Sequence, residues 1–230
     1  MLRDSEACKS CRNCKIKSPL FSLLAEDECD MLNKDRFEVQ FRPGELVFKE
    51  GSSASHVLSI TSGTAKIVKE NETKRLIVRL SRLYELLGAQ AIFGTGRYIY
   101  SVVALTDIKV CYIDVEPLRS ILQTNAAFNY RFTESILEET FLMYKRMESL
   151  LLRHSSGKLA ESMLFLKGMN CSDPDFINLS RGDLADVANM NRDNLHKLLK
   201  QFEHEGLVQL DEGGIRLLDQ SGLERLARVG

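Results

Sequence analysis

The sequence lacks any long hydrophobic run, although 44% of its 230 residues are hydrophobic. No apolar stretch approaches the roughly 20 residues that a helix needs to cross a bilayer. The opening stretch MLRDSEACKSCRNCK also lacks the apolar segment of a secretory signal. We therefore expect a cytoplasmic protein. Its thiols would stay reduced, so the six cysteines are metal-binding, redox-active or buried groups instead of disulfides.

The signatures of catalysis are missing as well. No nucleophile and base stand at a suggestive spacing, and there is no G-x-x-x-x-G-K phosphate loop. Gly94 and Gly96 form a G-x-G pair, but this pair does not open a helix after a strand, as a dinucleotide fingerprint would. We do not expect an enzyme. The net charge of −1 shows no bulk basicity, so a DNA-binding chain of this composition would need a local basic face.

Short runs rich in Val, Ile, Phe and Thr, separated by glycine turns, fill residues 19–114. Many short strands at close spacing predict a β-sandwich or β-barrel. Ala65 and Ile67 alternate with Lys66 and Lys69, which is typical of a strand with one face in water. The expected strands are Glu38–Arg42, Leu46–Lys49, His56–Thr61, Ala65–Lys69, Leu76–Leu80, Ser101–Leu105 and Lys109–Asp114.

A long helix is predicted from about Asn125 to Arg153, a stretch without glycine or proline. Two apolar stripes run along it, and such a helix usually packs on two partners, here its own barrel and a second copy. A single helix buried in a monomeric core is the alternative. The first stripe, near heptad spacing, is Phe132, Ile136, Met143, Met147 and Leu150; the second is Phe128, Leu137, Phe141, Tyr144 and Leu151.

Residues 179–206 show the pattern of a helix-turn-helix. Ser180 and Asp183 form a capping-box-like pair, Asn189 suits a left-handed turn, and Asn191 can cap a second helix. The first helix would bury Leu184, Val187 and Ala188, and the second Leu195, Leu198, Leu199 and Phe202.

The outer side of that second helix carries groups that read DNA. Arg and Lys can bond guanine O6 and N7, and Asp can accept from cytosine N4. Gly206–Leu210, a turn at 211–214 and Ile215–Leu218 follow as a β-hairpin wing. The alternative is that these charged residues form an ordinary solvent-exposed helix face. The cap, the turn, the charges and the wing together favour DNA binding. The predicted DNA-binding residues are Ser180, Arg192, Asp193, His196, Lys197 and Lys200.

Barrel, long helix and winged helix-turn-helix, in that order, resemble the Crp/Fnr family of bacterial transcription regulators. The stretches FRPGELVFKEGSSASHVLSITSGTAKI and SRGDLADVANMNRDNLHKLLKQFEHEGLV carry the resemblance, which covers nearly the whole chain. It implies an α+β homodimer on near-palindromic double-stranded DNA, contact with RNA polymerase, and base-reading positions at Arg192, Asp193, His196 and Lys197. The expected parts are a cysteine-rich segment (1–18), a jelly-roll, cyclic-nucleotide-binding-like sensor barrel (19–124), a dimerisation helix (125–153) and a winged helix-turn-helix domain (154–230).

The resemblance also gives a candidate effector pocket, in which cyclic-AMP members carry a Gly-Glu pair before an Arg-Ser pair. Here Gly88 is kept, Ala89 replaces the glutamate, and Tyr98 follows Arg97 near the place of the Arg-Ser pair. A cyclic nucleotide needs a cation and N–H groups at its phosphate, so these changes argue against cyclic AMP. The candidate pocket residues are Gly88, Ala89, Gln90, Arg97 and Tyr98.

The cysteines offer a different sensor. Cys8, Cys11 and Cys14, with the distant Cys111, resemble the iron–sulfur ligands of the oxygen-sensing Fnr branch, since four thiolates hold such a cluster. The chain departs from that pattern, because a further cysteine expected near Leu20 is missing and Cys8 would replace it. Zinc, thiol redox sensing or no cofactor are the alternatives. Cys29 and Cys171 are expected to be packing residues, and His56, His154, His196 and His204 are scattered candidates for a haem ligand.

We therefore expect a sequence-specific DNA-binding regulator whose effector acts at the sensor barrel or the N-terminal cysteines, with redox or oxygen sensing favoured. A cyclic nucleotide or another small molecule is the alternative signal. The alternative from a different functional class is a regulatory module that docks on an enzyme and binds no DNA. Such a module would not need residues 179–218.

Overall fold

The computed structural model describes residues 18–81, 83–167 and 173–229. The described chain divides into two compact units. The first contains the residues up to Lys69 together with Arg79–Thr140, and the second contains Glu70–Val78 and the residues from Phe141 onward. In these described ranges no helix combines the length and apolarity needed to span a membrane.

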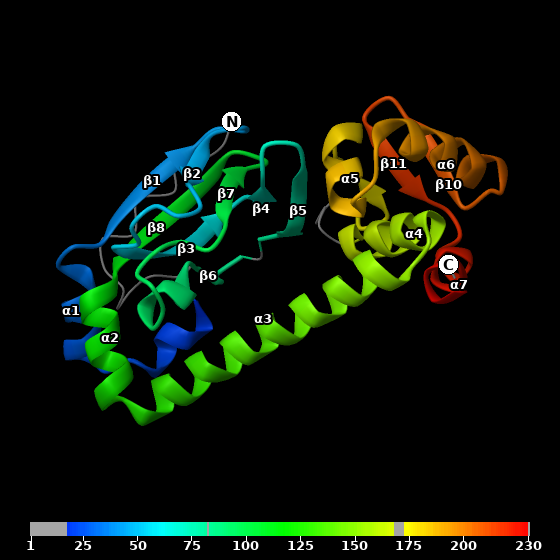
Figure 1. The fold of residues 1–230 in the computed structure, drawn as a ribbon. Helices are drawn as coiled ribbons and strands as arrows, with labels where there is room; N and C mark the ends of the chain where they lie inside the picture. Colours follow the sequence, from blue (N-terminus) through cyan, green and yellow to red (C-terminus); the bar gives the residue numbers. More distant parts are fainter. Residues whose placement is uncertain (1–17, 82, 168–172, 230) are drawn as a thin grey trace. The chain divides into compact units, whose positions relative to one another are not determined.

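Between residues 37 and 114, apart from residue 82, eight strands form two four-stranded sheets, ordered β1-β8-β3-β6 and β2-β7-β4-β5 (Figure 1). This is the predicted jelly roll, with two sheets packed together instead of a closed barrel. Seven of these strands match predicted ones closely, and β6 was not predicted. The strands are β1 (Phe37–Phe41), β2 (Leu46–Phe48), β3 (His56–Ser62), β4 (Ala65–Glu70), β5 (Arg75–Leu80), β6 (Leu86–Leu87), β7 (Ser101–Ala104) and β8 (Ile108–Asp114).

The alternation predicted for β4 is only partly right. Ala65 and Ile67 are buried as expected, but Lys66, assigned to the wet face, is only 8% exposed. The aliphatic stem of a lysine can be covered while its ammonium group finds a polar partner. Period-two patterning therefore identified the strand and misplaced one of its side chains.

Helices cover one face of the β1-β8-β3-β6 sheet and share a core with it. Phe21, Leu32 and Leu118 pack in this core with Cys111 of β8 and with Phe128 of the long helix. Asn125 begins the long helix by accepting the N–H of Phe128 at 2.9 Å. The helical segments are η1 (Pro19–Leu23), α1 (Glu26–Asn33), η2 (Ala89–Ile92), α2 (Val115–Thr124) and α3 (Ala126–Leu152).

The second unit carries a winged helix-turn-helix. Helices α5 and α6 pack through Leu184, Val187, Leu195, Leu199 and Phe202, each at most 1% exposed. The order of its small sheet is β10-β11-β9. Its elements after α3 are α4 (Ser155–Leu166), β9 (Phe176–Ile177), α5 (Arg181–Ala188), α6 (Arg192–His204), β10 (Val208–Asp211), β11 (Gly214–Leu217) and α7 (Gln220–Val229).

Candidate nucleic-acid interface and sensor pocket

Helix α5 begins at the predicted serine cap. Ser180 Oγ accepts the backbone N–H of Asp183 at 3.0 Å and donates to Asp183 Oδ2 at 2.9 Å. The Asp183 carboxylate therefore lies in the first turn, where the helix dipole favours negative charge. The predicted cap is confirmed. A DNA contact by Ser180, which is exposed, stays a prediction.

The turn between the two helices uses the two predicted asparagines. Asn189 adopts the left-handed conformation with φ 49° and ψ 52°. Asn191 Oδ1 then accepts the N–H of Asn194 at 2.8 Å and caps α6. Both residue types suit their positions, because Asn tolerates left-handed backbone and is a strong N-cap. This turn fixes the direction in which α6 leaves α5.

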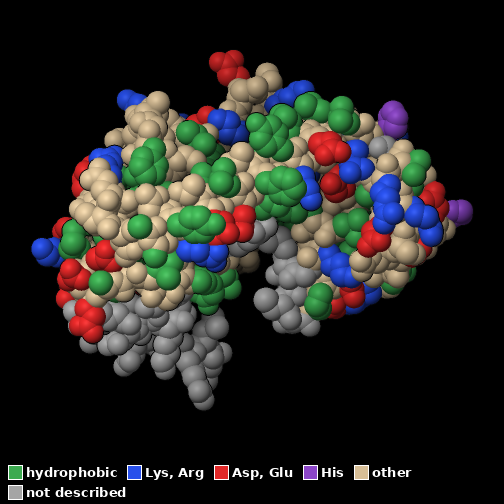
Figure 2. All heavy atoms as spheres, turned by 90° about the horizontal axis from the view of Figure 1, so that it is seen from below, with side chains coloured by type: hydrophobic (Ala, Val, Ile, Leu, Met, Phe, Trp, Pro, Cys, Tyr) green, Lys and Arg blue, Asp and Glu red, His purple; other side chains and the backbone are tan. Residues whose placement is uncertain are grey.

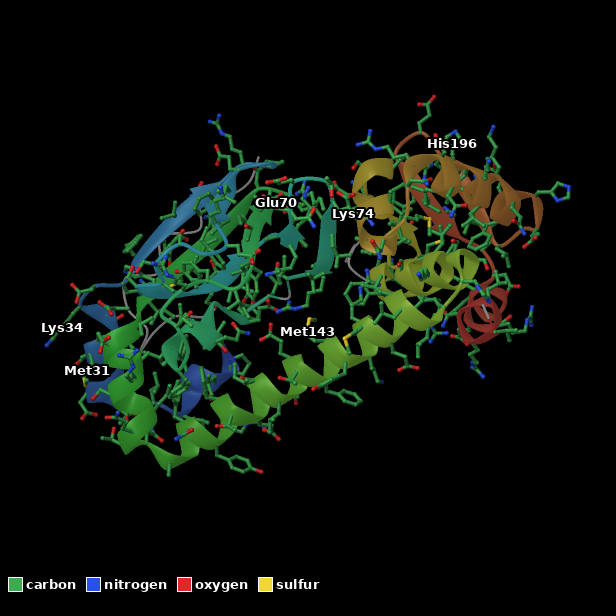
Figure 3. All side chains as sticks on the ribbon, in the orientation of Figure 1. Met31, Lys34, Glu70, Lys74, Met143 and His196 are labelled. Atoms are coloured by element: carbon green, nitrogen blue, oxygen red, sulfur yellow. The ribbon has the colours of Figure 1, made fainter. Side chains whose placement is uncertain are left out.

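Helix α6 presents the remaining predicted DNA-binding residues on its exposed side, where Figure 3 labels His196. Positions 192, 196 and 200 lie one above another on a helix, and so do 193 and 197. Leu198 was expected to be buried with Leu195 and Leu199, but it is only half-buried, at the edge of the packed face. The exposed residues are Arg192, Asp193, His196, Lys197 and Lys200.

Gly182 of α5 makes room for the first of these residues. A Cβ at position 182 would lie 3.0 Å from Arg192 Nη2. The guanidinium therefore lies across α5 at the start of α6, and a larger side chain at 182 would have to displace it. Sequence reasoning missed Gly182, because nothing local links it to a residue in the next helix.

The predicted wing is formed by β10 and β11. A Cβ on Gly214 would lie 2.4 Å from the backbone oxygen of Ile177 in β9, so no other residue fits there without a shift. Arg216 pairs with Asp173 at 2.9 Å, and its guanidinium lies 5.4 Å from the Phe176 ring centroid. These contacts hold the hairpin to β9 beside the recognition helix.

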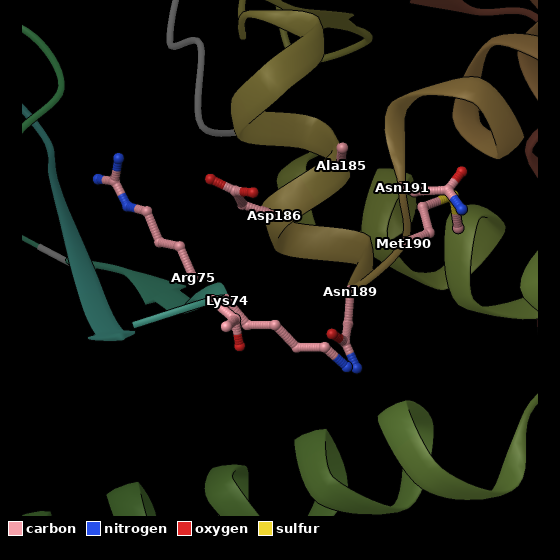
Figure 4. Close-up of a pocket in the computed structure, with 8 residues that line it drawn as sticks. Lys74, Arg75, Ala185, Asp186, Asn189, Met190 and Asn191 are labelled. Carbon is pink, nitrogen blue, oxygen red and sulfur yellow. The ribbon is translucent and has the colours of Figure 1, made fainter. Parts of the chain in front are cut away.

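A polar hollow of about 410 Å³ also lies in the second unit (Figure 4). Lys74 extends towards Asn189 of the helix turn, and Arg75 and Asp186 stand beside it. Nearby, Arg146 of α3 donates to the carbonyl oxygens of Val78 and Val187. Burial lowers the pKa of Arg146, although Glu161 acts in the opposite direction. None of these cations belongs to the predicted DNA-binding set.

The two apolar stripes of α3 have different surroundings. Phe128 and Phe132 are 0% and 2% exposed in the first unit's core, and Ile136 packs against the same core. The opposite side is exposed, and Figure 2, which views the face bearing α3, shows hydrophobic side chains gathered along the helix. Its exposed residues are Tyr130 (71%), Leu137 (63%), Phe141 (59%), Tyr144 (65%), Met147 (50%), Leu151 (71%) and Leu152 (78%).

The predicted stripes were therefore each partly wrong in membership. Phe128, placed with the second stripe, is buried in the core, while Met147, placed with the first, is half exposed. Tyr130, absent from both, begins a series that recurs every seven residues through Leu137, Tyr144 and Leu151. Apolar spacing alone could not sort the stripes, because both are continuous along the helix.

Two tyrosines fill the space around Gly88 in the sensor. Tyr98 stacks on Phe48 with ring centroids 3.9 Å apart, and its hydroxyl donates to the backbone oxygen of His56 at 2.7 Å. The hydroxyl of Tyr100 accepts the N–H of Gly88 at 2.9 Å. A Cβ on Gly88 would lie 2.6 Å from the Tyr98 ring. The loop amide is thus already bonded within the chain.

Burial sets the ionisation of both phenols. It raises the pKa of Tyr98 to about 12, with Tyr112 adding to the effect. It also raises the pKa of Tyr100, with a further contribution from the Glu139 carboxylate. Both hydroxyls therefore stay protonated at neutral pH and act as hydrogen-bonding groups.

The five predicted pocket residues do not all meet. Gly88 and Tyr98 are in contact, and Gln90 lies beside Tyr100. Ala89 is buried in the helical core that contains Cys111. Arg97 is exposed, and it donates to the backbone oxygen of Gly51 at 2.6 Å. Arg97 is thus hydrogen-bonded at the surface instead of lining the space occupied by the tyrosines.

Cys111 is the one predicted metal ligand within the described residues; Cys8, Cys11 and Cys14 lie outside them. Its side chain is 7% exposed, and Arg36 donates to Sγ at 3.3 Å. A neighbouring guanidinium favours a thiolate, the form that ligates metals. The same Arg36 nitrogen also donates to Glu38 Oε1 at 2.9 Å, and the described ranges hold no group of three or more His, Cys, Asp or Glu residues that could bind a metal.

The roles predicted for the other cysteines and for the histidines are tested only in part. Cys29 is 5% exposed in α1, as expected of a packing residue, while Cys171 lies outside the described residues. The His56 ring packs against the rings of Phe37 and Tyr112, and its centroid lies 5.4 Å from that of Phe37. The haem hypothesis stays a prediction, since nothing observed tests it.

The jelly roll, the long helix and the winged helix-turn-helix define a class, that of two-domain transcription regulators with a sensor and a DNA-binding part. Two family models match this chain accordingly. Residues 38–125 match the cyclic nucleotide-binding domain, and residues 145–226 match the Crp-like helix-turn-helix domain. The chain belongs to the Crp/Fnr family of transcription regulators, with a DNA-binding helix-turn-helix and an effector-binding domain.

Relatives agree with this assignment. The HTH-type transcriptional regulator Cmr of Mycobacterium tuberculosis is 22% identical, covering 80% of this chain and 73% of the relative. The CRP-like cAMP-activated global transcriptional regulator of that species is 21% identical, covering 76% and 81%. A regulator assigned to the Crp/Fnr family from Eubacterium rectale has a structure with TM-score 0.77 and 18% identity, covering 91% and 98%.

The sensor interior does not fit a cyclic nucleotide, although its fold is that of the nucleotide-binding domain. The Gly88 N–H, which could bind a phosphate, is bonded to Tyr100. Arg97 is exposed and directed to Gly51. A bound phosphate needs both a cation and N–H groups, and the side chains described here do not present them together.

Sequence reasoning missed Tyr100 and its polar neighbours Arg79, Glu85 and Glu139. These residues come together from the strand β5, two loops and α3. In the sequence these residues stand out only as polar positions within otherwise apolar patterns. Such a pattern does not indicate which side chain each residue contacts.

Proposed function

We propose that the chain is a homodimer that reads a near-palindromic DNA site with the exposed side of α6. One observation carries the proposal: five polar residues lie exposed on a helix whose opposite side is buried against α5. Arg192 and Asp193 stand in the first turn, the part of a recognition helix that contacts base edges. Lys197 and Lys200 add positive charge that suits base or phosphate contact.

The exposed stripe of α3 supports the dimer. Tyr130, Leu137, Tyr144 and Leu151 recur every seven residues, and each is at least 63% exposed in the single chain. A seven-residue apolar repeat is the pattern of two helices that pack along each other. A second copy of α3 would cover this stripe and leave the core-facing side of the helix unchanged. A two-fold dimer in turn explains why the site would be near-palindromic.

We further propose that the signal is of the redox or oxygen type and enters through the cysteines. Support comes from Cys111, which is buried beside the Arg36 guanidinium in the core that also contains Phe21 of η1. An iron–sulfur cluster would be held by Cys8, Cys11, Cys14 and Cys111, and it would supply a group whose oxidation state responds to the cell. The change would act by favouring one of two dimer geometries.

The DNA-binding proposal is tested by substituting single residues of α6. The wild-type chain is first used to enrich duplexes from a random pool, and the affinity for the selected duplex is measured by fluorescence anisotropy. Arg192→Ala and Lys197→Ala should each weaken specific binding by about 1–3 kcal/mol, because each removes a charge-assisted base contact. Sedimentation should show that the dimer is intact.

Lys49→Ala is the matched control, since it removes one exposed cation from the sensor. It should leave the affinity for the selected duplex within about twofold, and all variants should lose affinity as salt rises. If Arg192→Ala and Lys197→Ala bind the same sequences with the same affinity as the wild type, α6 does not read bases. A wild-type chain that enriches no duplex would favour the alternative, a module that docks on an enzyme.

A further inference from the structure

Tyr100 lies at one end of a series of partly buried polar contacts that runs from the sensor interior to α3. Its hydroxyl lies 3.5 Å from Gln90 Oε1, and Gln90 Nε2 donates to Glu139 Oε2 at 2.6 Å. Arg79 Nη2 donates to the other oxygen of Glu139 at 2.8 Å. Glu85 completes the group by accepting from Arg79. We call these five residues the sensor–helix network.

Arg79 anchors the network on the β5 strand. It is 9% exposed, and its Nη1 lies 2.8 and 3.0 Å from the two oxygens of Glu85. Burial by itself lowers the pKa of Arg79, but the nearby carboxylates of Glu85 and Glu139 outweigh it and raise the pKa. Arg79 therefore stays charged, and loss of either carboxylate would leave a buried charge less well compensated.

The network joins α3 to the loop that the family resemblance assigns to the effector. The Tyr100 hydroxyl accepts the Gly88 N–H, while Glu139 of α3 accepts from Arg79 and Gln90. The connections among the five network residues are direct contacts between side chains, and Tyr100 reaches the loop through the backbone N–H of Gly88. A displacement of the Gly88 loop would therefore alter the partners of Glu139.

We propose that Tyr98 and Tyr100 take the place of a small-molecule effector in this sensor, and that the sensor–helix network sets the position of α3 without any added ligand. The Tyr98 ring fills the space next to Gly88, and the Tyr100 hydroxyl takes up the amide that a phosphate would use. A cyclic nucleotide is thereby excluded, and the signal has to enter elsewhere. This inference rests on the proposed function, because its readout is DNA binding by the dimer that α3 is proposed to form.

A double-mutant cycle tests the network. Tyr100→Phe removes one hydroxyl, Glu139→Gln removes one charge, and the third chain carries both changes. Each single variant should bind the selected duplex about fivefold or more weakly, the lower range of measured couplings between sites. Because both residues act through Gln90, the double variant should lose little more affinity for the duplex than the weaker-binding of the two single variants. Glu138→Gln, at the neighbouring exposed carboxylate, should bind like the wild type.

If the two fold-losses of affinity simply multiply in the double variant, the residues act independently and the network is overturned. Wild-type affinity in both single variants would also overturn it. Melting and sedimentation of each variant show whether it is folded and dimeric. Tyr100→Phe keeps the ring, so it remains an informative chain if Glu139→Gln fails to fold. Hydrogen exchange provides a local measurement, and residues 126–140 of α3 should exchange faster in both variants than in the wild type.

Titration with cyclic AMP tests the occupancy by the tyrosines. Millimolar cyclic AMP should leave the Tm of the wild-type chain unchanged, since a ligand raises Tm only if it binds the folded state. A saturable rise in Tm would overturn the proposal that the tyrosines fill the site. A wild-type chain that selects no DNA would instead contradict the proposed function, and the titration would still decide the tyrosine occupancy.

Discussion

At the scale of single residues, the sensor interior is defined by the contact between Gly88 and Tyr98. Gly88 has a positive φ of 79°, and even a methyl group there would meet the Tyr98 ring at 2.6 Å. The ring also stacks on that of Phe48, at 3.9 Å between centroids. Glycine is thus required at position 88 both for its backbone conformation and for its size.

The raised pKa of Tyr98 predicts a loss of stability in alkali. The folded pKa of about 12 lies above the ordinary value of 10.0, so the folded state keeps its proton where the unfolded chain loses it. The contribution of this group is complete below about pH 10 and declines as the pH rises towards about 12. Tyr98→Phe should therefore lose less free energy of unfolding across this window than the wild type.

Urea unfolding at about pH 9 and about pH 11.5 measures the difference. The wild-type chain, measured under the same conditions, is the reference. A loss of free energy across the window that is identical in Tyr98→Phe and in the wild type would show that ionisation of Tyr98 does not contribute to it.

How much of the residue-level detail the sequence predicts depends on the distance between partners. Ser180 with Asp183 and Asn191 with Asn194 are three residues apart, and both caps were predicted correctly. Arg79 and Glu139 are 60 residues apart, and their contact was not foreseen. Local rules describe a helix end because its partners are neighbours in sequence, whereas a partly buried ion pair between β5 and α3 depends on how the chain folds between them.

At the scale of elements, α3 combines two surfaces on one continuous helix. The side with Phe128 and Phe132 belongs to the chain's own core, and the opposite side is exposed. A polar substitution on the exposed side should therefore weaken the proposed dimer and leave the core packing unchanged.

Leu137→Asp should convert the dimer into monomers. Leu137 is 63% exposed in the single chain, and a carboxylate placed between two packed helices would be buried without a partner. Light scattering after gel filtration measures the mass, and affinity for the selected duplex should fall with it. Leu137→Met conserves volume and apolarity and should stay dimeric. A Leu137→Asp chain that remains a dimer would show that the interface lies on another surface.

The predicted elements agree best with the structure where their pattern was long or bounded by clear turns. Seven strands of the jelly roll and the helices α3, α5 and α6 were predicted. The strand β6, only Leu86–Leu87, is too short to show any alternation. Helix α1 was missed because it has eight residues and its polar sequence, EDECDMLN, gives a weak apolar stripe.

At the scale of the whole molecule, a filled sensor interior and a cysteine-based signal are compatible. The ring of Tyr98 occupies the interior, and Cys111 lies on the other side of β8 from Tyr112, in the helical core. A change at Cys111 would therefore reach α3 through the core shared with Phe128 and Phe132. By linkage, whatever oxidation state binds DNA more tightly is itself favoured by DNA.

Anaerobic purification tests the cysteine proposal. The wild-type dimer should be brown, contain iron and change its affinity for the selected duplex after exposure to air. Cys11→Ser and Cys111→Ser should each lose the colour and the response to air. Cys29→Ala, which changes a buried cysteine of α1, should keep both. A colourless anaerobic preparation without iron would contradict the cluster and leave thiol oxidation or zinc to be examined.

The packing of Tyr98 against Gly88 and Phe48 has a consequence for kinetics. No small molecule can occupy that interior until the ring has left, and a buried aromatic ring leaves only when its surroundings open. For any ligand that did enter, the observed rate of binding would level off at the opening rate as its concentration increased. A response through this site would thus have a maximum speed set by the protein, whatever the amount of signal present.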